Sequence, residues 1–147
     1  MILSTLKDIQ SISSSLNLLR TYSDSHFYSS FLNCSCQNAP RRVIESYKQN
    51  WVQAEDKLSR LRSSNQNGEI TQPIELNEKI KLVLDKLGEV NTSKINEKVE
   101  NSYSDIRNFV AIDNIPANEK KIEELYQAVE ELKSSIIQYL SFVNFLN

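Results

Sequence analysis

The most regular hydrophobic pattern in the chain lies at residues 117–146. Its apolar residues follow one another at alternating steps of three and four, which is the spacing of a heptad seam on one long helix. The seam consists of Ile122, Leu125, Val129, Leu132, Ile136, Tyr139, Val143 and Leu146. The pattern predicts a helix that packs along its whole length against other helices.

Three earlier stretches also place apolar residues at helical spacing. They cover residues 2–32, about 40–64 and 75–110. The third is interrupted between Gly88 and Ser93, where Gly favours a helix end and Thr or Ser favours a start, so we expect a kink or a break there. Loops are expected at 33–40 and 65–74, the second of which holds an Asn-Gly turn signal.

These stretches predict a single all-α domain over residues 1–147, an up-and-down bundle of four long helices with the third kinked or broken. The sequence holds only two Gly and three Pro, which leaves little material for many short turns. Its 39% apolar and 24% charged residues are ordinary for a globular domain and too apolar for disorder.

The first residues and the cysteines predict a cytoplasmic location. The start of the chain lacks the basic and apolar regions of a signal peptide. A disulfide between Cys34 and Cys36 would close a very small, strained loop, which favours a reducing compartment. The most apolar run, 135–147, is too short to span a bilayer, so no membrane association is expected.

Few side chains are suited to catalysis. His26 is the only histidine, and with Cys34 and Cys36 it supplies three soft ligands where zinc takes four. Glu97 and Glu100 fit half of the acidic site of an all-helical, metal-dependent nucleotide pyrophosphatase-like enzyme, but the second acidic pair is missing at suitable spacing. We therefore expect no enzyme activity, no metal or cofactor, and no small-molecule substrate.

A basic helix is the second candidate for function. Residues 41–62 carry six basic and three acidic groups in a chain whose net charge is -2. The basic residues are Arg41, Arg42, Lys48, Lys57, Arg60 and Arg62. They suit phosphate contacts in a small nucleic-acid-binding subunit. The competing interpretation is that they pair with the acidic third and fourth helices, while Tyr47 and Trp51 belong to the core seam.

The polar face of the first helix carries serines instead of charged residues, among them Ser11, Ser14 and Ser15. An uncharged face costs little to desolvate, so it fits either a central helix between neighbours or a surface that docks a partner.

The last helix is apolar nearly all round after Ile136, and such a helix is normally buried on every side. Ile137, Phe142 and Phe145 point away from the seam, which predicts a patch closed by a second copy or another protein. The alternative is cover by the first helix and the 33–40 loop. The preferred function is a non-enzymatic protein-binding module: a small complex subunit, an adaptor or an inhibitor or immunity-type protein, bound to a protein partner or homo-oligomeric.

Overall fold

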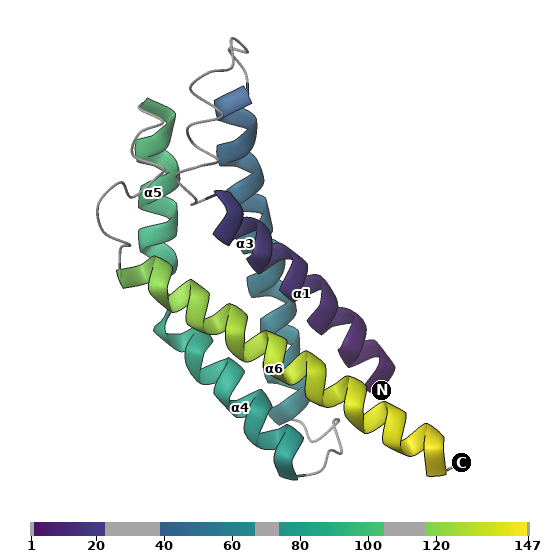
Figure 1. The fold of residues 1–147 in the computed structure, drawn as a ribbon. Helices are drawn as coiled ribbons and strands as arrows, with labels where there is room; N and C mark the ends of the chain where they lie inside the picture. Colours follow the sequence, from purple (N-terminus) through teal and green to yellow (C-terminus); the bar gives the residue numbers. More distant parts are fainter. Residues whose placement is uncertain (1, 23–38, 67–73, 105–116, 147) are drawn as a thin grey trace.

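The computed structural model describes residues 2–22, 39–66, 74–104 and 117–146, and these ranges are helical apart from Val90 and Asn91. The helices are α1 (Ile2–Tyr22), α3 (Ala39–Gln66), α4 (Ile74–Glu89), α5 (Thr92–Ser104) and α6 (Ala117–Leu146) (Figure 1). The described ranges contain no strand, so the prediction of an all-helical chain is confirmed.

The helix ends follow the sequence pattern closely where the structure describes them. The last helix occupies the predicted range of 117–146, and α3 begins beside Pro40, whose missing N–H group does no harm in a first turn. The expected continuation of the first helix to residue 32 and of the third segment to residue 110 lies outside the described residues.

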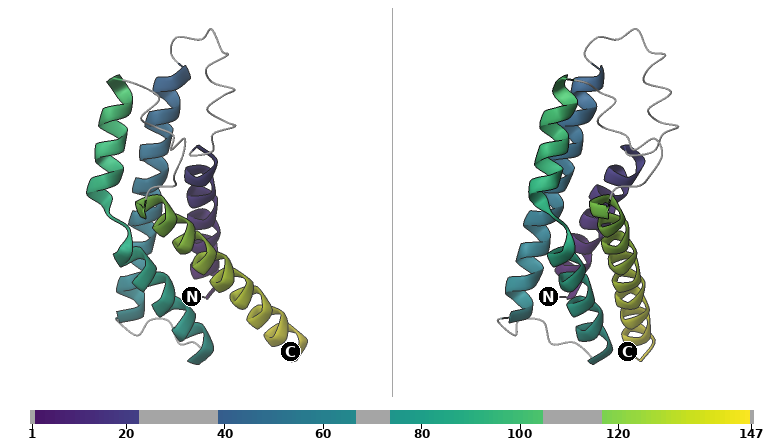
Figure 2. Two further views of the ribbon diagram at one scale, coloured as in Figure 1. Left: turned by 60° about the vertical axis from the view of Figure 1, so that its left-hand side comes forward. Right: turned by 90° about the vertical axis from the view of Figure 1, so that its left-hand side faces the viewer.

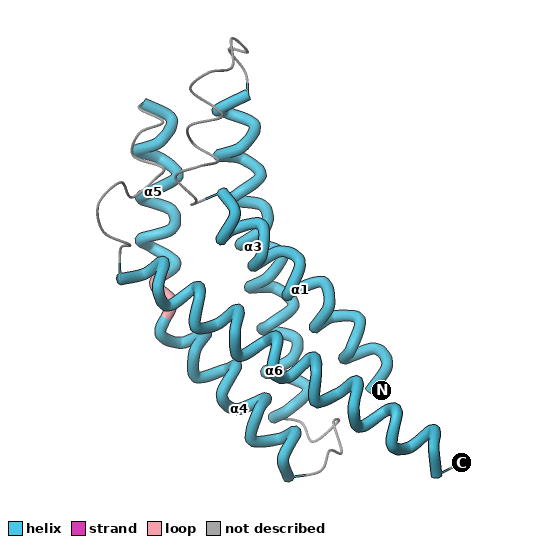
Figure 3. Tube along the Cα trace, in the orientation of Figure 1, coloured by secondary structure: helices cyan, strands magenta, loops and turns pink. Residues whose placement is uncertain are grey.

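The third segment is divided into α4 and α5, so the described ranges hold five helices where the pattern predicted four. The link is short, and Figure 3 shows it between the two helices. Asn91 caps the start of α5, since its Oδ1 accepts a hydrogen bond from the backbone N–H of Lys94 at 3.3 Å. Asn91 is also fixed to the start of α6: its N–H donates to Asn118 Oδ1 at 2.6 Å, and Asn118 Nδ2 donates to the Asn91 carbonyl at 3.1 Å.

Helix α1 lies between α3 and α6, and α6 also packs against α4 (Figures 1 and 2). The contacting helices run antiparallel to each other. The first turns of α3 continue past the end of α1, and α5 lies beside the N-terminal half of α3 (Figure 2).

The core is formed by the seams that the sequence predicts. Leu125, Val129 and Leu132 of α6 are fully buried, as are Tyr47 and Trp51 of α3 to within 2%. Each such side chain contributes about 1.5–3 kcal/mol through removal of its apolar surface from water. The interpretation of the two α3 aromatics as core residues is therefore confirmed. No helix of the described residues has the length and apolar character needed to cross a membrane.

Candidate functional site

Helices α1 and α6 pack in one antiparallel register that two polar contacts define. Arg20 of α1 pairs with Glu123 of α6, and Ser13 donates a hydrogen bond to Glu130. The two contacts are seven residues apart in α1 and also seven residues apart in α6, so the two helices keep the same register between them. When this register is continued, Ile2, the first residue of α1, lies opposite residue 141 of α6.

Helices α4 and α6 have their own register, set by ion pairs. Lys86 lies 3.5 Å from Glu124, and Lys121 lies 3.6 Å from Glu89, both measured between nitrogen and oxygen. Continuing this register places Ile74, the first residue of α4, opposite Ile136. The part of α6 that follows has no facing residue in α4.

We call residues 137–146 the C-terminal segment of α6. The whole segment extends past the start of α4, and its end also extends past the start of α1. Figure 1 and the left view of Figure 2 show the end of α6, marked C, projecting beyond the starts of α1 and α4. Ile137 is 44% exposed and Phe142 is 59% exposed. These two predicted partner-binding residues thus lie on the surface of the described structure, whereas the side chain of Phe145 lies outside it.

The C-terminal segment also lacks the charges that accompany the rest of α6. Between Glu119 and Lys133 the helix carries eight charged residues, and several of them pair with α1 or α4. From Ser134 to Asn147 there is no charged residue. The exposed residues described here are Ile137, Gln138, Ser141 and Phe142, so the surface is uncharged and carries two large apolar side chains among polar ones. Exposed apolar side chains without charged neighbours are common at contact surfaces.

The serine-rich face of α1 is used largely inside the molecule. Ser15 is only 5% exposed, and Ser13 donates to Glu130 of α6. Ser11 accepts a hydrogen bond from Lys57 of α3. Of the three serines predicted to bind a partner, Ser14 alone is exposed. Small, uncharged side chains suit a helix that has a neighbour on each side.

The basic residues of α3 do not converge on one surface. Lys57 contacts Ser11, and Arg60 Nη2 lies 3.2 Å from Asp8 Oδ1, so both turn toward α1. These partners belong to α1, not to the acidic helices that the sequence suggested. Lys48 lies on the side of α5. Arg42 and Arg62 are exposed, and the side chain of Arg41 lies outside the described residues.

A buried ion pair joins three helices beside the α4–α5 break. Lys98 of α5 pairs with Glu119 of α6, and the two side chains are only 13% and 11% exposed. The Lys98 ammonium also lies 5.1 Å from the centroid of the Tyr47 ring of α3, within cation–π range. Burial lowers the pKa of Lys98 below its ordinary value, and the Glu119 carboxylate opposes that shift. The sequence pattern does not reveal this pair, because nothing in the spacing places residues 98 and 119 together.

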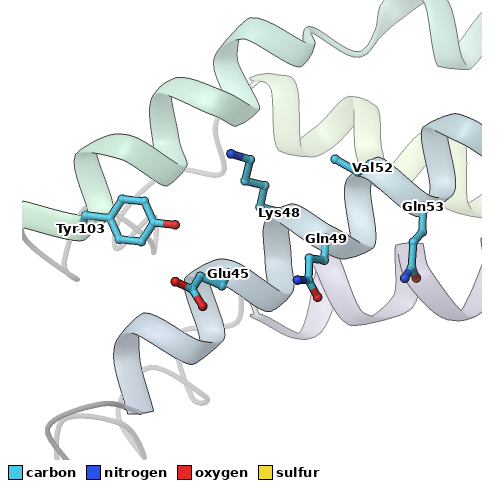
Figure 4. A pocket seen from close by; sticks show the side chains of 6 residues that line it. All are labelled: Glu45, Lys48, Gln49, Val52, Gln53 and Tyr103. Atoms are coloured by element: carbon cyan, nitrogen blue, oxygen red, sulfur yellow. The ribbon is translucent and has the colours of Figure 1, made fainter.

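A groove of about 450 Å³ lies between α3 and α5. It is lined by Glu45, Lys48, Gln49, Val52, Gln53 and Tyr103. Figure 4 shows Tyr103 facing this row from α5, with its hydroxyl directed toward Glu45. Its volume suits a small ligand or a side chain, but its lining mixes both charges with amides and an exposed valine, which favours no one ligand class. The lining residues lie off the seam on helices that are distant in sequence, so no pattern reveals the groove.

The acidic pair considered for metal binding lies on the surface of α5. Glu97 and Glu100 are exposed, and Glu97 lies 3.4 Å from Lys94. Among the described residues, no group of three or more His, Cys, Asp or Glu side chains is placed to hold a metal ion. Cys34, Cys36 and His26 lie outside the described ranges.

Comparisons of this chain with protein-family models, with curated proteins and with solved structures give no match.

Proposed function

We propose that this chain is a non-enzymatic protein-binding module, such as a small subunit of a complex, an adaptor or an inhibitor-type protein. The observation that supports the proposal is the C-terminal segment of α6, which continues past its neighbours with Ile137 and Phe142 exposed. Tyr139 and Leu140 still pack against the core, whereas Ile137 and Phe142 do not belong to it, so the apolar character of these two residues has no evident role in the fold.

Aromatic side chains at the centre of an apolar patch are typical of protein interfaces, where they supply most of the binding energy. Phe142 is a large aromatic side chain that is exposed and distant from any charged residue in its helix. Of the three serines predicted to bind a partner, only Ser14 remains available on the surface of α1. Ser11 is hydrogen-bonded to Lys57, and Ser15 is buried.

The proposal includes the overall architecture and location. We treat α4 and α5 as one long helix interrupted at Val90 and Asn91, which makes the chain an up-and-down bundle of four. The two closely spaced cysteines favour a cytoplasmic location.

Nucleic-acid binding through α3 is the second candidate, because Arg42, Arg60 and Arg62 are exposed. Binding of this kind weakens steeply with salt, since each phosphate contact releases counterions. We expect no salt-dependent shift of RNA or DNA, because Arg60 and Lys57 face α1. A shift that Arg42→Ala with Arg62→Ala abolishes would favour this second candidate.

The protein-binding proposal is tested by affinity capture from a lysate of the organism that encodes the chain, with quantitative mass spectrometry. The wild-type chain is compared with Phe142→Glu and with a control, Leu82→Glu. Leu82 is a 40% exposed apolar residue of α4, so the control makes the same chemical change at another surface. We expect a protein that is retained by the wild type and by the control but lost by Phe142→Glu. Identical captured proteins for all three baits would contradict the proposal.

A further inference from the structure

We infer that the partner of the C-terminal segment of α6 is the same segment of a second copy, packed antiparallel across a two-fold axis near Phe142. This inference rests on the proposed function, and it names the partner of that surface.

The face of α6 that contacts α4 continues beyond the start of α4. Lys121 and Glu124 mark that face, because both pair with α4 residues. Steps of three and four from there, which follow one side of a helix, lead through Ala128 and Leu132 to Ser135, Tyr139 and Phe142. Phe142 is therefore the exposed apolar residue on the side where α4 is no longer present. A helix of matching apolar character fits this place.

The chemistry of the segment suits a copy of itself. In a two-fold contact the same patch occurs on both subunits, so any charge near the axis meets its own like charge. The fourteen residues from Ser134 to Asn147 carry no charge, and this condition for self-pairing is fulfilled. The preceding turns of α6 do not fulfil it, because Glu130, Glu131 and Lys133 lie there.

The geometry repeats a packing mode that the molecule already uses. Two helices related by a two-fold axis perpendicular to them run antiparallel, as α4 does to α6. The partner's segment then lies on the face that α4 leaves open. Phe142 is near the middle of residues 137–146, so the two copies of Phe142 meet at the axis.

The contact is small. Ten helical residues span only about 15 Å, so the contact is smaller than a standard protein interface. Self-association is therefore expected to depend on protein concentration, with dimers dissociating on dilution.

Sedimentation velocity over a concentration series tests the inference with two charge variants, Phe142→Glu and Phe142→Lys. The wild type should shift from monomer to dimer as concentration rises. Each variant alone should remain monomeric, because like charges meet at the axis. An equal mixture of the two should form dimers again, since opposite charges then face each other across it.

Leu82→Glu and Leu82→Lys serve as matched controls and should dimerise as the wild type does. Circular dichroism confirms that each variant is helical, and Phe142→Gln supplies an uncharged second variant that should weaken dimerisation at least tenfold.

A wild type that stays monomeric at every concentration would overturn the inference. So would a mixture that fails to dimerise when the wild type does. The protein-binding proposal fails separately: it survives a monomeric wild type if Phe142→Glu still loses a captured protein.

Discussion

The two parts of helix α6 have the same seam spacing but opposite surroundings. In residues 117–136 the seam is buried between α1 and α4, and the flanking charges pair with both. In residues 137–146 the seam positions Tyr139 and Val143 are only half-buried, and the exposed flanks carry Ile137, Phe142 and uncharged polar residues instead of charged ones. The change occurs where α4 begins and, one turn later, where α1 begins.

The difference shows that a heptad seam predicts a helix and the side on which it packs. The flanking residues indicate how far the neighbouring helices of the same chain extend along it. Charged flanks stay solvated or pair at the edges of a contact. Apolar flanks without an internal neighbour leave surface that another molecule can cover.

The largest expected effect belongs to the buried part of the seam. Leu132→Asp places an unpaired carboxylate in a fully buried position and removes an apolar side chain from the core. The combined loss is on the order of 4 kcal/mol, a large share of the stability of a small domain. Urea unfolding followed by circular dichroism measures it. A variant as stable as the wild type would mean that the core lies elsewhere.

The next effect concerns the start of α6. Lys98→Met leaves Glu119 buried without its partner, and we expect a loss of about 3 kcal/mol. The double variant Lys98→Met with Glu119→Met removes both charges and should recover most of that loss. Equal instability of the single and double variants would show that the pair is not coupled. The same unfolding experiment gives all three values.

A smaller and pH-dependent effect is expected where α1 meets α6. The hydrogen bond from Ser13, aided by Lys133, holds the pKa of Glu130 below its ordinary value of 4.5. The folded protein then binds this proton less readily than the unfolded chain does. The ionised Glu130 therefore stabilises the fold fully above pH 4.5, and this stabilisation is lost as the pH falls through the pKa of Glu130 in the folded protein.

Glu130→Gln removes this contribution, and its cost should be within about 1 kcal/mol, because the side chain is partly exposed. The cost should be largest near neutral pH and should vanish in acid. Unfolding free energies measured across this range check the sign, and a cost that grows in acid would contradict it. Glu131→Gln, an exposed neighbour in the same helix, is the control.

Periodicity was sufficient to predict the all-helical class and the full extent of the last helix, because burial of one face imposes the spacing of three and four residues. It also marked Ile137 and Phe142 as residues off the seam. For the serines it left two alternatives open, a central helix or a docking surface: Ser13 and Ser15 are buried, which agrees with the central helix, whereas Ser14 is exposed.

The polar contacts between helices were the least predictable part. Lys98 and Glu119, or Asn91 and Asn118, meet only because α5 and α6 are placed together at the break. Their sequence neighbours have similar composition, so no local signal distinguishes the buried charge from the many exposed ones. The basic residues of α3 were misjudged in part for the same reason, since their partners proved to lie in α1.

The most direct test of the central claim, that the C-terminal segment of α6 is surface and not core, is the unfolding free energy of Phe142→Glu in dilute solution, where the chain is monomeric. A surface substitution should change it by no more than about 0.5 kcal/mol and leave the helical signal intact. A loss of about 3 kcal/mol or more, comparable with that of a buried aromatic, would show that Phe142 belongs to the core and would contradict the account.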